Sequence, residues 1–430
     1  MGISRFSTLS TLGGLILAVG ACALFKPVED ARLQNGVGDA VASGGAVVHI
    51  SLGGVNDGDG FAARRASVGL AQDRVLAAME GDGFKLIHRY ENVAALTGVL
   101  SESGLDALMA RSELRRVSLD LKGSGALDDS VSQISANQWA AVGETGAGSI
   151  VAVLDSGVVD HPDLSDDLIH ESCILGARVA AGGLPCPDGS AQTLDTAGSA
   201  LDGHGHGTNV AGIVTSGGSV TPAGVAPGAQ LIAVKIFDDD NNFSATDAVM
   251  ALDYLLTQKA LGALDMRVIN ISGGALPPVG ECNLGIGADM GDLVAALEAF
   301  GVLTVAAAGN DSQTTRLAFP ACVDGVFAVG AVDDDNDPLA QSNVAPKLDV
   351  LAPGRDITSA GITATQISTL TGSSQAAPHV AGCAALRISD DPTLTVAELK
   401  TILTLTSTFI DIPGTGLTFP RLFCGLPPTI

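Results

Sequence analysis

One stretch of the 430-residue sequence decides the fold: SIVAVLDSG, at residues 149–157. The apolar residues from Ile150 to Leu154 show no polar alternation, which is typical of a strand covered on both faces. Asp155 follows at the carboxyl end of this expected strand. Similar runs, separated by helical stretches, recur at 231–236, 268–271, 302–306 and 326–329. The alternation predicts a doubly wound α/β fold with a mostly parallel sheet over residues 131–430.

A smaller unit is expected at residues 46–122, before the larger one. Its expected elements are a strand, a helix, two strands around a turn, a helix and a strand, at 46–50, 66–79, 90–100, 105–111 and 114–121. This β-α-β-β-α-β order is the ferredoxin-like pattern, so we expect a small α+β domain. The stretch GSGALDDS at 123–130 follows it, and such an exposed joint is a preferred site of proteolysis.

The first 22 residues have the pattern of an export signal. Arg5 supplies the positive charge, and the apolar run from Leu9 to Val19 is too short for a comfortable membrane span. The small residues before Cys22 resemble the lipobox of bacterial lipoproteins, in which that cysteine is lipidated, and ordinary signal cleavage nearby is the alternative. Residues 23–45 are expected to be a linker. We therefore expect a secreted or cell-envelope protein, with Cys22 as a candidate lipid anchor to the membrane.

The acidic composition excludes one class of partner. The formal net charge is −25, and such a surface repels phosphate backbones, so we expect no nucleic-acid binding. Besides Cys22 there are six cysteines, and an even number in an exported protein predicts disulfide bonds. Cys173 and Cys186 bracket a Gly- and Pro-rich loop and are the first expected pair, whereas Cys383 lies in an apolar stretch and could simply be buried. No Cys-x-x-Cys spacing indicates a zinc site.

Two polar residues have settings that suit serine hydrolysis of a peptide bond, which needs a nucleophile, a base and an acid that orients the base. Asp155, at the end of a buried strand, is well placed to hold an imidazole. His206 lies in GHGHGTNVAG at 203–212, where small residues lead into a helix. His204 is an equally placed rival, and the spacing alone does not choose between the two.

The candidate nucleophile lies in TGSSQAAPHVAG, at residues 371–382. Ser374 stands at the start of an expected helix, where the dipole and the unpaired amides favour negative charge. Ser373 is an equally good serine on these grounds. The residues alone therefore leave the choice of serine open.

Together these blocks resemble the subtilisin-like serine protease family, from about residue 135 to 425, whose chain order is Asp, His, Ser. The matching blocks are DSG with HPDL, HGT with VAG, and GSS with AAPHVAG, and GVAP and AVK lie between them. The resemblance implies a triad of Asp155, His206 and Ser374, so it selects His206 over His204 and Ser374 over Ser373. It implies a serine endopeptidase that cleaves protein or peptide substrates through an acyl-enzyme intermediate.

The resemblance also gives the small unit a role. Residues 46–122 would be an inhibitory and chaperone prodomain whose last strand lies in the active site like a product, with the cut between about 121 and 130. The protein would then be a monomeric, self-processing zymogen. The alternatives are a separate binding domain at 46–122 and a non-catalytic fold that only binds peptides. An esterase of the α/β-hydrolase type is excluded because Ser374 does not lie in Gly-x-Ser-x-Gly.

Further site residues follow from the resemblance. Asn310, in AAGN at 307–310, would donate to the oxyanion of the transition state. An edge segment would pair with an extended substrate backbone, and a second segment would line an apolar or broadly selective pocket. The expected substrate-binding residues are Ser272, Gly273 and Gly274 on the edge, and Ala308 and Gly309 at the pocket.

Two positions depart from the family pattern. Asn209 replaces a histidine that is not the base, so activity should survive. Gln375 replaces the methionine that usually follows the nucleophile, which disturbs the packing there and removes a thioether that peroxide oxidises. We therefore expect unusual tolerance of peroxide.

One structural metal is expected, and no cofactor is expected for catalysis. Asp349 resembles an aspartate that binds a structural calcium ion in some members of the family. Its partners would be backbone carbonyls near Asp324 and Val326, since a hard cation needs several oxygen ligands.

Overall fold

The computed structural model describes residues 32–34, 37–42, 45–55, 61–77, 79, 83–119, 122–124, 130–406 and 408–425. The expected signal segment at 1–22, with Cys22, and most of the joint at 123–130 lie outside these ranges. Within them, no helix is both long and apolar enough to cross a membrane.

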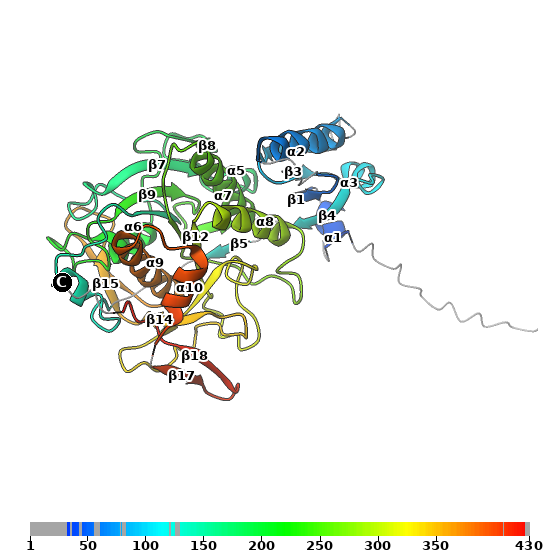
Figure 1. The fold of residues 1–430 in the computed structure, drawn as a ribbon. Helices are drawn as coiled ribbons and strands as arrows, with labels where there is room; N and C mark the ends of the chain where they lie inside the picture. Colours follow the sequence, from blue (N-terminus) through cyan, green and yellow to red (C-terminus); the bar gives the residue numbers. More distant parts are fainter. Residues whose placement is uncertain are drawn as a thin grey trace, which may run out of the picture. The chain divides into compact units, whose positions relative to one another are not determined.

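The larger unit is built on one eight-stranded sheet (Figure 1). Its neighbouring strands run parallel except for β7 and β8 at one edge. In sheet order the strands are β14 (Val350–Pro353), β13 (Phe327–Val332), β12 (Leu303–Ala307), β11 (Val268–Ile271), β6 (Ile150–Asp155), β9 (Gln230–Lys235), β7 (Leu168–Ile174) and β8 (Gln192–Thr193). The doubly wound, mostly parallel fold is therefore confirmed.

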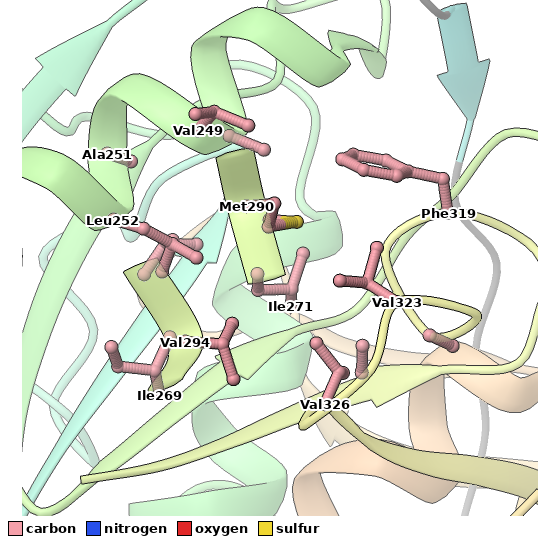
Figure 2. Close-up of a cluster of buried hydrophobic side chains, with 14 of the residues drawn as sticks. Val249, Ala251, Leu252, Ile269, Ile271, Met290, Val294, Phe319, Val323 and Val326 are labelled. Carbon is pink, nitrogen blue, oxygen red and sulfur yellow. The ribbon is translucent and has the colours of Figure 1, made fainter. Parts of the chain in front are cut away.

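Both faces of this sheet are covered, as the apolar run at 150–154 predicts. Along β6, Ala152 and Leu154 belong to one buried cluster, and Val151 and Val153 belong to another on the opposite face. Figure 2 shows part of the first cluster. The covering helices are α7 (Ala245–Ala260) and α8 (Ile286–Ala299) at the first cluster, and α6 (His206–Thr215), α9 (Ser373–Asp390) and α10 (Val396–Thr404) at the second. Smaller elements are α5 (Gly176–Ala180) and the hairpins β15 (Ile357–Ala360) with β16 (Ile367–Leu370), and β17 (Phe409–Ile412) with β18 (Leu417–Pro420).

Strand β6 lies where the winding of the sheet reverses. The chain places β9 on one side of β6 and later places β11 on the other side. At such a point the loops that follow neighbouring strands leave in opposite directions and open a crevice. Asp155, the last residue of β6, therefore lies where open α/β sheets bind their ligands.

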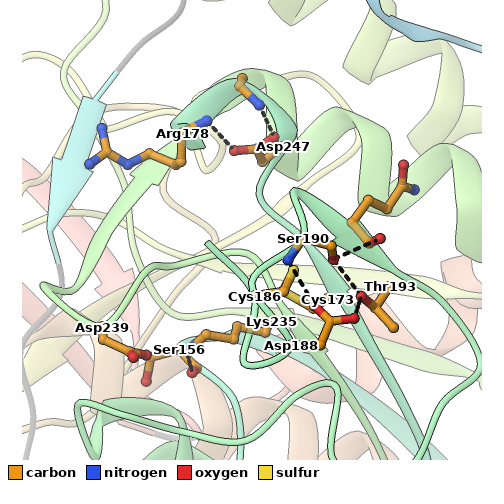
Figure 3. The surroundings of a disulfide bond; sticks show 12 residues. Ser156, Cys173, Arg178, Cys186, Asp188, Ser190, Thr193, Lys235, Asp239 and Asp247 are labelled. Carbon is orange, nitrogen blue, oxygen red and sulfur yellow. Dashed lines mark hydrogen bonds and ion pairs between the residues drawn. A yellow bond between two sulfur atoms is a disulfide. The ribbon is translucent and has the colours of Figure 1, made fainter. Parts of the chain in front are cut away.

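Three disulfide bonds hold the larger unit: Cys173–Cys186, Cys282–Cys322 and Cys383–Cys424. The expected pair Cys173–Cys186 is confirmed, and Figure 3 shows its surroundings. Cys383 is buried, as its apolar setting predicts, but it is also bonded to Cys424. The apolar stretch did not reveal this pair because the partner comes from the far end of the chain.

A tryptophan also holds the last described residues, next to Cys424, in place. Trp139, in α4 (Asn137–Ala140), is fully buried. Its indole Nε1 donates to the carbonyl oxygen of Gly425 at 2.9 Å, and the guanidinium of Arg387 lies 4.7 Å from the ring centroid. The last described residues are therefore part of the packed core.

The smaller unit contains a four-stranded antiparallel sheet of order β2-β3-β1-β4, the ferredoxin-like order. Its elements are β1 (Ala46–Leu52), α2 (Phe61–Leu76), β2 (Phe84–Arg89), β3 (Ala95–Leu100), α3 (Glu102–Met109) and β4 (Leu114–Leu119). The expected linker at 23–45 contains a further helix, α1 (Val37–Ala42), because Val37 and Val41 are buried in the core of this unit. The unit therefore begins before residue 46.

Candidate active site

Asp155 and His206 come together at the carboxyl end of β6. His206 is the first residue of α6, and its Nδ1 lies 2.5 Å from Oδ1 of Asp155. Both side chains are 1% exposed. A carboxylate in this position selects the tautomer that carries its proton on Nδ1. Nε2 is then unprotonated and can act as a base.

Glycines make this approach possible. Gly205 has a φ of 99° and turns the chain into α6. A side chain at Gly207 would meet the carbonyl oxygen of Gly157 at 2.2 Å, so glycine lets the start of α6 lie against the end of β6. The small residues around His206 in the sequence have this physical cause.

Ser374 is the second residue of α9, whose first three turns are buried. This helix packs against α6 and against β11 and β12. Ser374 is 1% exposed and lies among the amides of the helix start, which favour negative charge on a nearby oxygen. The packing of α9 on α6 joins the element that carries Ser374 to the element that carries His206.

Local contacts distinguish the two pairs of rivals. Oγ of Ser373 accepts a hydrogen bond from the amide of Gly309 at 3.0 Å, and the amide of Ser373 donates to Oδ1 of Asn310 at 2.8 Å. Ser373 therefore holds the loop that carries Asn310. His204 is exposed, whereas His206 is buried against the carboxylate of β6. These contacts support the choice of Ser374 and His206.

Asn310 follows β12 in a tightly held loop. Gly309 has a φ of 96°, and a side chain there would meet Nδ2 of Asn343 at 2.4 Å. Asn343 accepts from the amide of Asp311 at 2.9 Å and donates to the carbonyl oxygen of Ala308 at 3.1 Å. Since Oδ1 of Asn310 accepts from the backbone of α9, its Nδ2 is the amide donor that can serve an oxyanion. Asn343 was not predicted, because a lone asparagine in a loop has no sequence signature of burial.

The edge segment after β11 presents main chain rather than side chains. Ser272 is fully buried. A side chain at Gly273 would meet the ring of Phe237 at 2.4 Å, and one at Gly274 would meet the carbonyl oxygen of Phe319 at 2.7 Å. The two glycines therefore keep this backbone close to its neighbours, as a strand-pairing edge requires.

A second strand that can pair with an extended segment was not predicted from the sequence. Strand β5 (Lys122–Ser124) pairs antiparallel with β10 (Asn242–Ser244), just before α7. The stretch DDDNNFS indicates a solvated acidic loop, yet Phe243 is fully buried. Ser244 caps α7 by accepting from the amide of Thr246 at 3.2 Å. A serine before a helical run is an N-cap signal, and it was the available sequence evidence for structure here.

Comparison with known proteins identifies the family. The model of the subtilase family matches residues 146–420. The chain belongs to the subtilase family.

Several similar proteins have names that agree with this assignment. An alkaline protease of Alkalihalobacillus alcalophilus is 31% identical over 350 residues, 80% of this chain and 82% of that protein. Subtilisin E of Bacillus subtilis (strain 168) is 30% identical over 359 residues, which cover 82% and 84%. Subtilisin BL of Lederbergia lenta is 34% identical over 279 residues, which cover 64% and 90%. This subtilase is therefore a serine endopeptidase.

The side chain of Gln375 is buried in this subtilase directly after Ser374. Among the described residues, neither Oε1 nor Nε2 of Gln375 has a hydrogen-bond partner. Its carbonyl oxygen bonds Nδ1 of His379 at 2.7 Å, and burial lowers the pKa of His379 to about 4, so that ring is neutral near pH 7. The buried amide of Gln375 therefore lacks hydrogen bonds, which lowers the free energy of unfolding by about 1–3 kcal/mol.

We expect the subtilase to retain its activity in dilute hydrogen peroxide. No thioether follows Ser374, and Met250, Met266 and Met290 are all buried. In Gln375→Met the unpaired amide is lost, so the free energy of unfolding should rise by about 1–3 kcal/mol, while activity becomes sensitive to peroxide. Timed exposure of both proteins, followed by an assay of residual activity, measures the difference. Rapid inactivation of the wild type would contradict this expectation.

The residues expected to hold calcium do not fit an ion. Nζ of Lys347 donates to the carbonyl oxygen of Val326 at 2.7 Å and lies 3.5 Å from Oδ2 of Asp349. The amide of Asp324 bonds the side chain of Asn283. An ammonium group thus contacts two of the expected ligands, and its charge would repel a calcium ion. The described part of the chain also contains no cluster of three or more His, Cys, Asp or Glu residues arranged for a metal.

Asp349 is therefore not expected to contribute to stability through calcium. The ion pair of Lys347 with Asp349 needs no metal, so any change of Tm in EDTA should be the same in the wild type and in Asp349→Asn. Differential scanning fluorimetry of the wild type and of Asp349→Asn measures both changes. A fall of the wild-type Tm in EDTA that is absent from Asp349→Asn would instead show that Asp349 binds calcium.

Proposed function

We propose that this subtilase is a secreted endopeptidase that works through Asp155, His206 and Ser374 and is made as a self-processing zymogen. The observation that carries the proposal is the buried hydrogen bond between His206 and Asp155 at the switch point of the sheet, beside the helix that begins at Ser373. With Nδ1 engaged by Asp155, Nε2 of His206 is the nitrogen that takes the proton of the Ser374 hydroxyl.

The proposed reaction has two halves. Oγ of Ser374 attacks the carbonyl carbon of the scissile bond while His206 takes its proton, and Nδ2 of Asn310 donates to the oxyanion. His206 then gives the proton to the leaving amine, and an acyl-enzyme remains on Ser374. Water, deprotonated by His206, hydrolyses that ester and restores the serine. Ser272, Gly273 and Gly274 would pair with the substrate backbone, and Ala308 and Gly309 would border its side-chain pocket.

The small unit is proposed to be an intramolecular inhibitor. Its backbone amides at Glu91 and Asn92 donate to Asp253 of α7 at 2.6 and 2.9 Å. His49 and Ser51 both bond the carboxylate of Asp289 in α8. The pairing of β5 with β10 supports the same role, because a segment paired there would occupy an edge that substrate needs.

The N-terminal segment is proposed to decide where the protein acts. Residues 1–22 would direct export, and Cys22 would carry the lipid if the protein is held at the membrane. Protein or peptide substrates would then be met outside the cytoplasm, after the prodomain has been removed.

One experiment tests the proposal. The chain from residue 23 to 430 is expressed, its mass is followed with time, and it is treated with a fluorophosphonate probe. We expect loss of roughly the first hundred residues and labelling of the larger fragment. A folded protein that neither shortens nor labels would instead favour the non-catalytic, peptide-binding alternative.

A further inference from the structure

The geometry points to Asp202 as a positioning residue for the catalytic base: its carboxylate holds the backbone on both sides of His206 and joins it to the end of β6. This inference rests on the proposed function. Sequence reasoning did not select Asp202, although it lies four residues before His206.

The carboxylate of Asp202 is a buried hub of hydrogen bonds, and the residue is 4% exposed. Oδ1 accepts from the amides of His204 and Gly205 at 2.9 and 2.8 Å. Oδ2 accepts from the amide and the hydroxyl of Thr208 at 3.0 and 2.7 Å. Burial by itself would raise the pKa of Asp202, but these bonds outweigh it and hold the pKa below its usual value. The group is therefore an anion at neutral pH.

These partners lie on both sides of the base along the chain. His204 and Gly205 precede His206, and Thr208 follows it by two residues. Gly205 is the N-cap of α6 and has no side chain to satisfy the helix amides, so Asp202 supplies the missing cap. The backbone that carries the imidazole is thus tied to one point.

A second connection runs from this hub to the other side of the triad. Oγ of Ser156 donates to Oδ1 of Asp202 at 2.8 Å and accepts from the amide of Gly207 at 2.8 Å. Ser156 directly follows Asp155, and its carbonyl oxygen accepts from Nζ of the buried Lys235 (Figure 3). The path through Ser156 therefore runs beside the hydrogen bond between Asp155 and His206, and it sets the separation of the two backbones.

The expected result for Asp202→Asn is a loss of turnover at each active site. Asparagine has one acceptor oxygen, so it cannot accept the bonds from Thr208 and also those from the amides of His204 and Gly205, and the imidazole should sit less accurately against Asp155. We expect kcat per titrated active site to fall about 10- to 100-fold with KM changed less than about twofold. The acidic limb of the kcat/KM profile should move to lower pH, because imidazolium loses both a nearby anion and part of its contact with Asp155.

Asp163→Asn is the matched control. Asp163 is also a buried carboxylate, 3% exposed, and it accepts from the amides of Ser219, Val220 and Thr221. Its bonds tie a loop that does not flank His206. Asp163→Asn should therefore lower Tm while kcat per active site and the pH profile stay as in the wild type.

Ser156→Ala keeps the test decisive if Asp202→Asn does not fold. It removes the bridge alone and should show a smaller loss of kcat in the same direction, with a smaller shift of the acidic limb to lower pH, because the Asp202 carboxylate keeps its charge. Wild-type kcat and an unmoved pH profile in the folded variants, with only Tm lowered, would overturn the positioning role and leave the proposed function intact. A wild type that the fluorophosphonate does not label would overturn both.

Discussion

Ser374→Ala is expected to leave the chain uncut between residues 121 and 130 and unlabelled by a fluorophosphonate. Without Oγ no acyl-enzyme forms, and no neighbouring hydroxyl can replace it, because Ser373 is engaged by the loop of Asn310. The loss of turnover should be roughly 10⁶-fold, the size found for the triad serine of subtilisin, a relative of this chain. Intact mass, followed over days, measures the self-processing step directly.

Ser373→Ala is the control for this result. It removes a neighbouring hydroxyl of the same helix and should still process and label, with a reduced rate because the Asn310 loop is less firmly held. The proposed assignment would be wrong if Ser374→Ala processed at the wild-type rate, or if Ser373→Ala alone abolished labelling.

Asp155→Asn should slow self-processing by about 10⁴-fold while the protein stays folded. The side chain keeps its shape, but its amide can donate to Nδ1 and so favours the tautomer with its proton on Nε2. That tautomer cannot accept the proton of Ser374. A time course of chain shortening gives the rate, and circular dichroism reports the fold.

Asp160→Asn provides the matched change for this second result. Asp160 lies five residues after Asp155 and is exposed, so its loss removes the same charge without touching the imidazole. It should process like the wild type. Equal slowing in both variants would mean that net charge, rather than orientation of His206, controls the rate.

Much of the larger unit could be predicted from the sequence because its signals are local. A run such as residues 150–154 is apolar throughout only when both faces are covered, and the two buried clusters on either side of β6 are the cause. The assignments of His206 and Ser374 depended on resemblance, since His204 and Ser373 have nearly the same local setting. Their contacts separate them only after folding.

What could not be predicted depends on long-range contacts. Cys424 reaches Cys383 across 41 residues, and the ammonium of Lys347 contacts a carbonyl 21 residues away. Asp202 has an ordinary position in a glycine-rich loop, and its role appears only when β6 and α6 meet. The sequence around Val37–Ala42 is rich in Gly, Ala and Asp, which predicts a linker, yet Val37 and Val41 are covered by the small core.

The burial of Trp139 against Gly425 has a practical consequence. The sequence contains one tryptophan, so fluorescence that is excited at the red edge of the absorption band comes from this single ring. It senses the joint between the start of the larger unit and the last described residues, where it bonds the carbonyl oxygen of Gly425. Each variant discussed above therefore carries an intrinsic optical reporter of unfolding, without an introduced dye and without a second indole to confuse the signal.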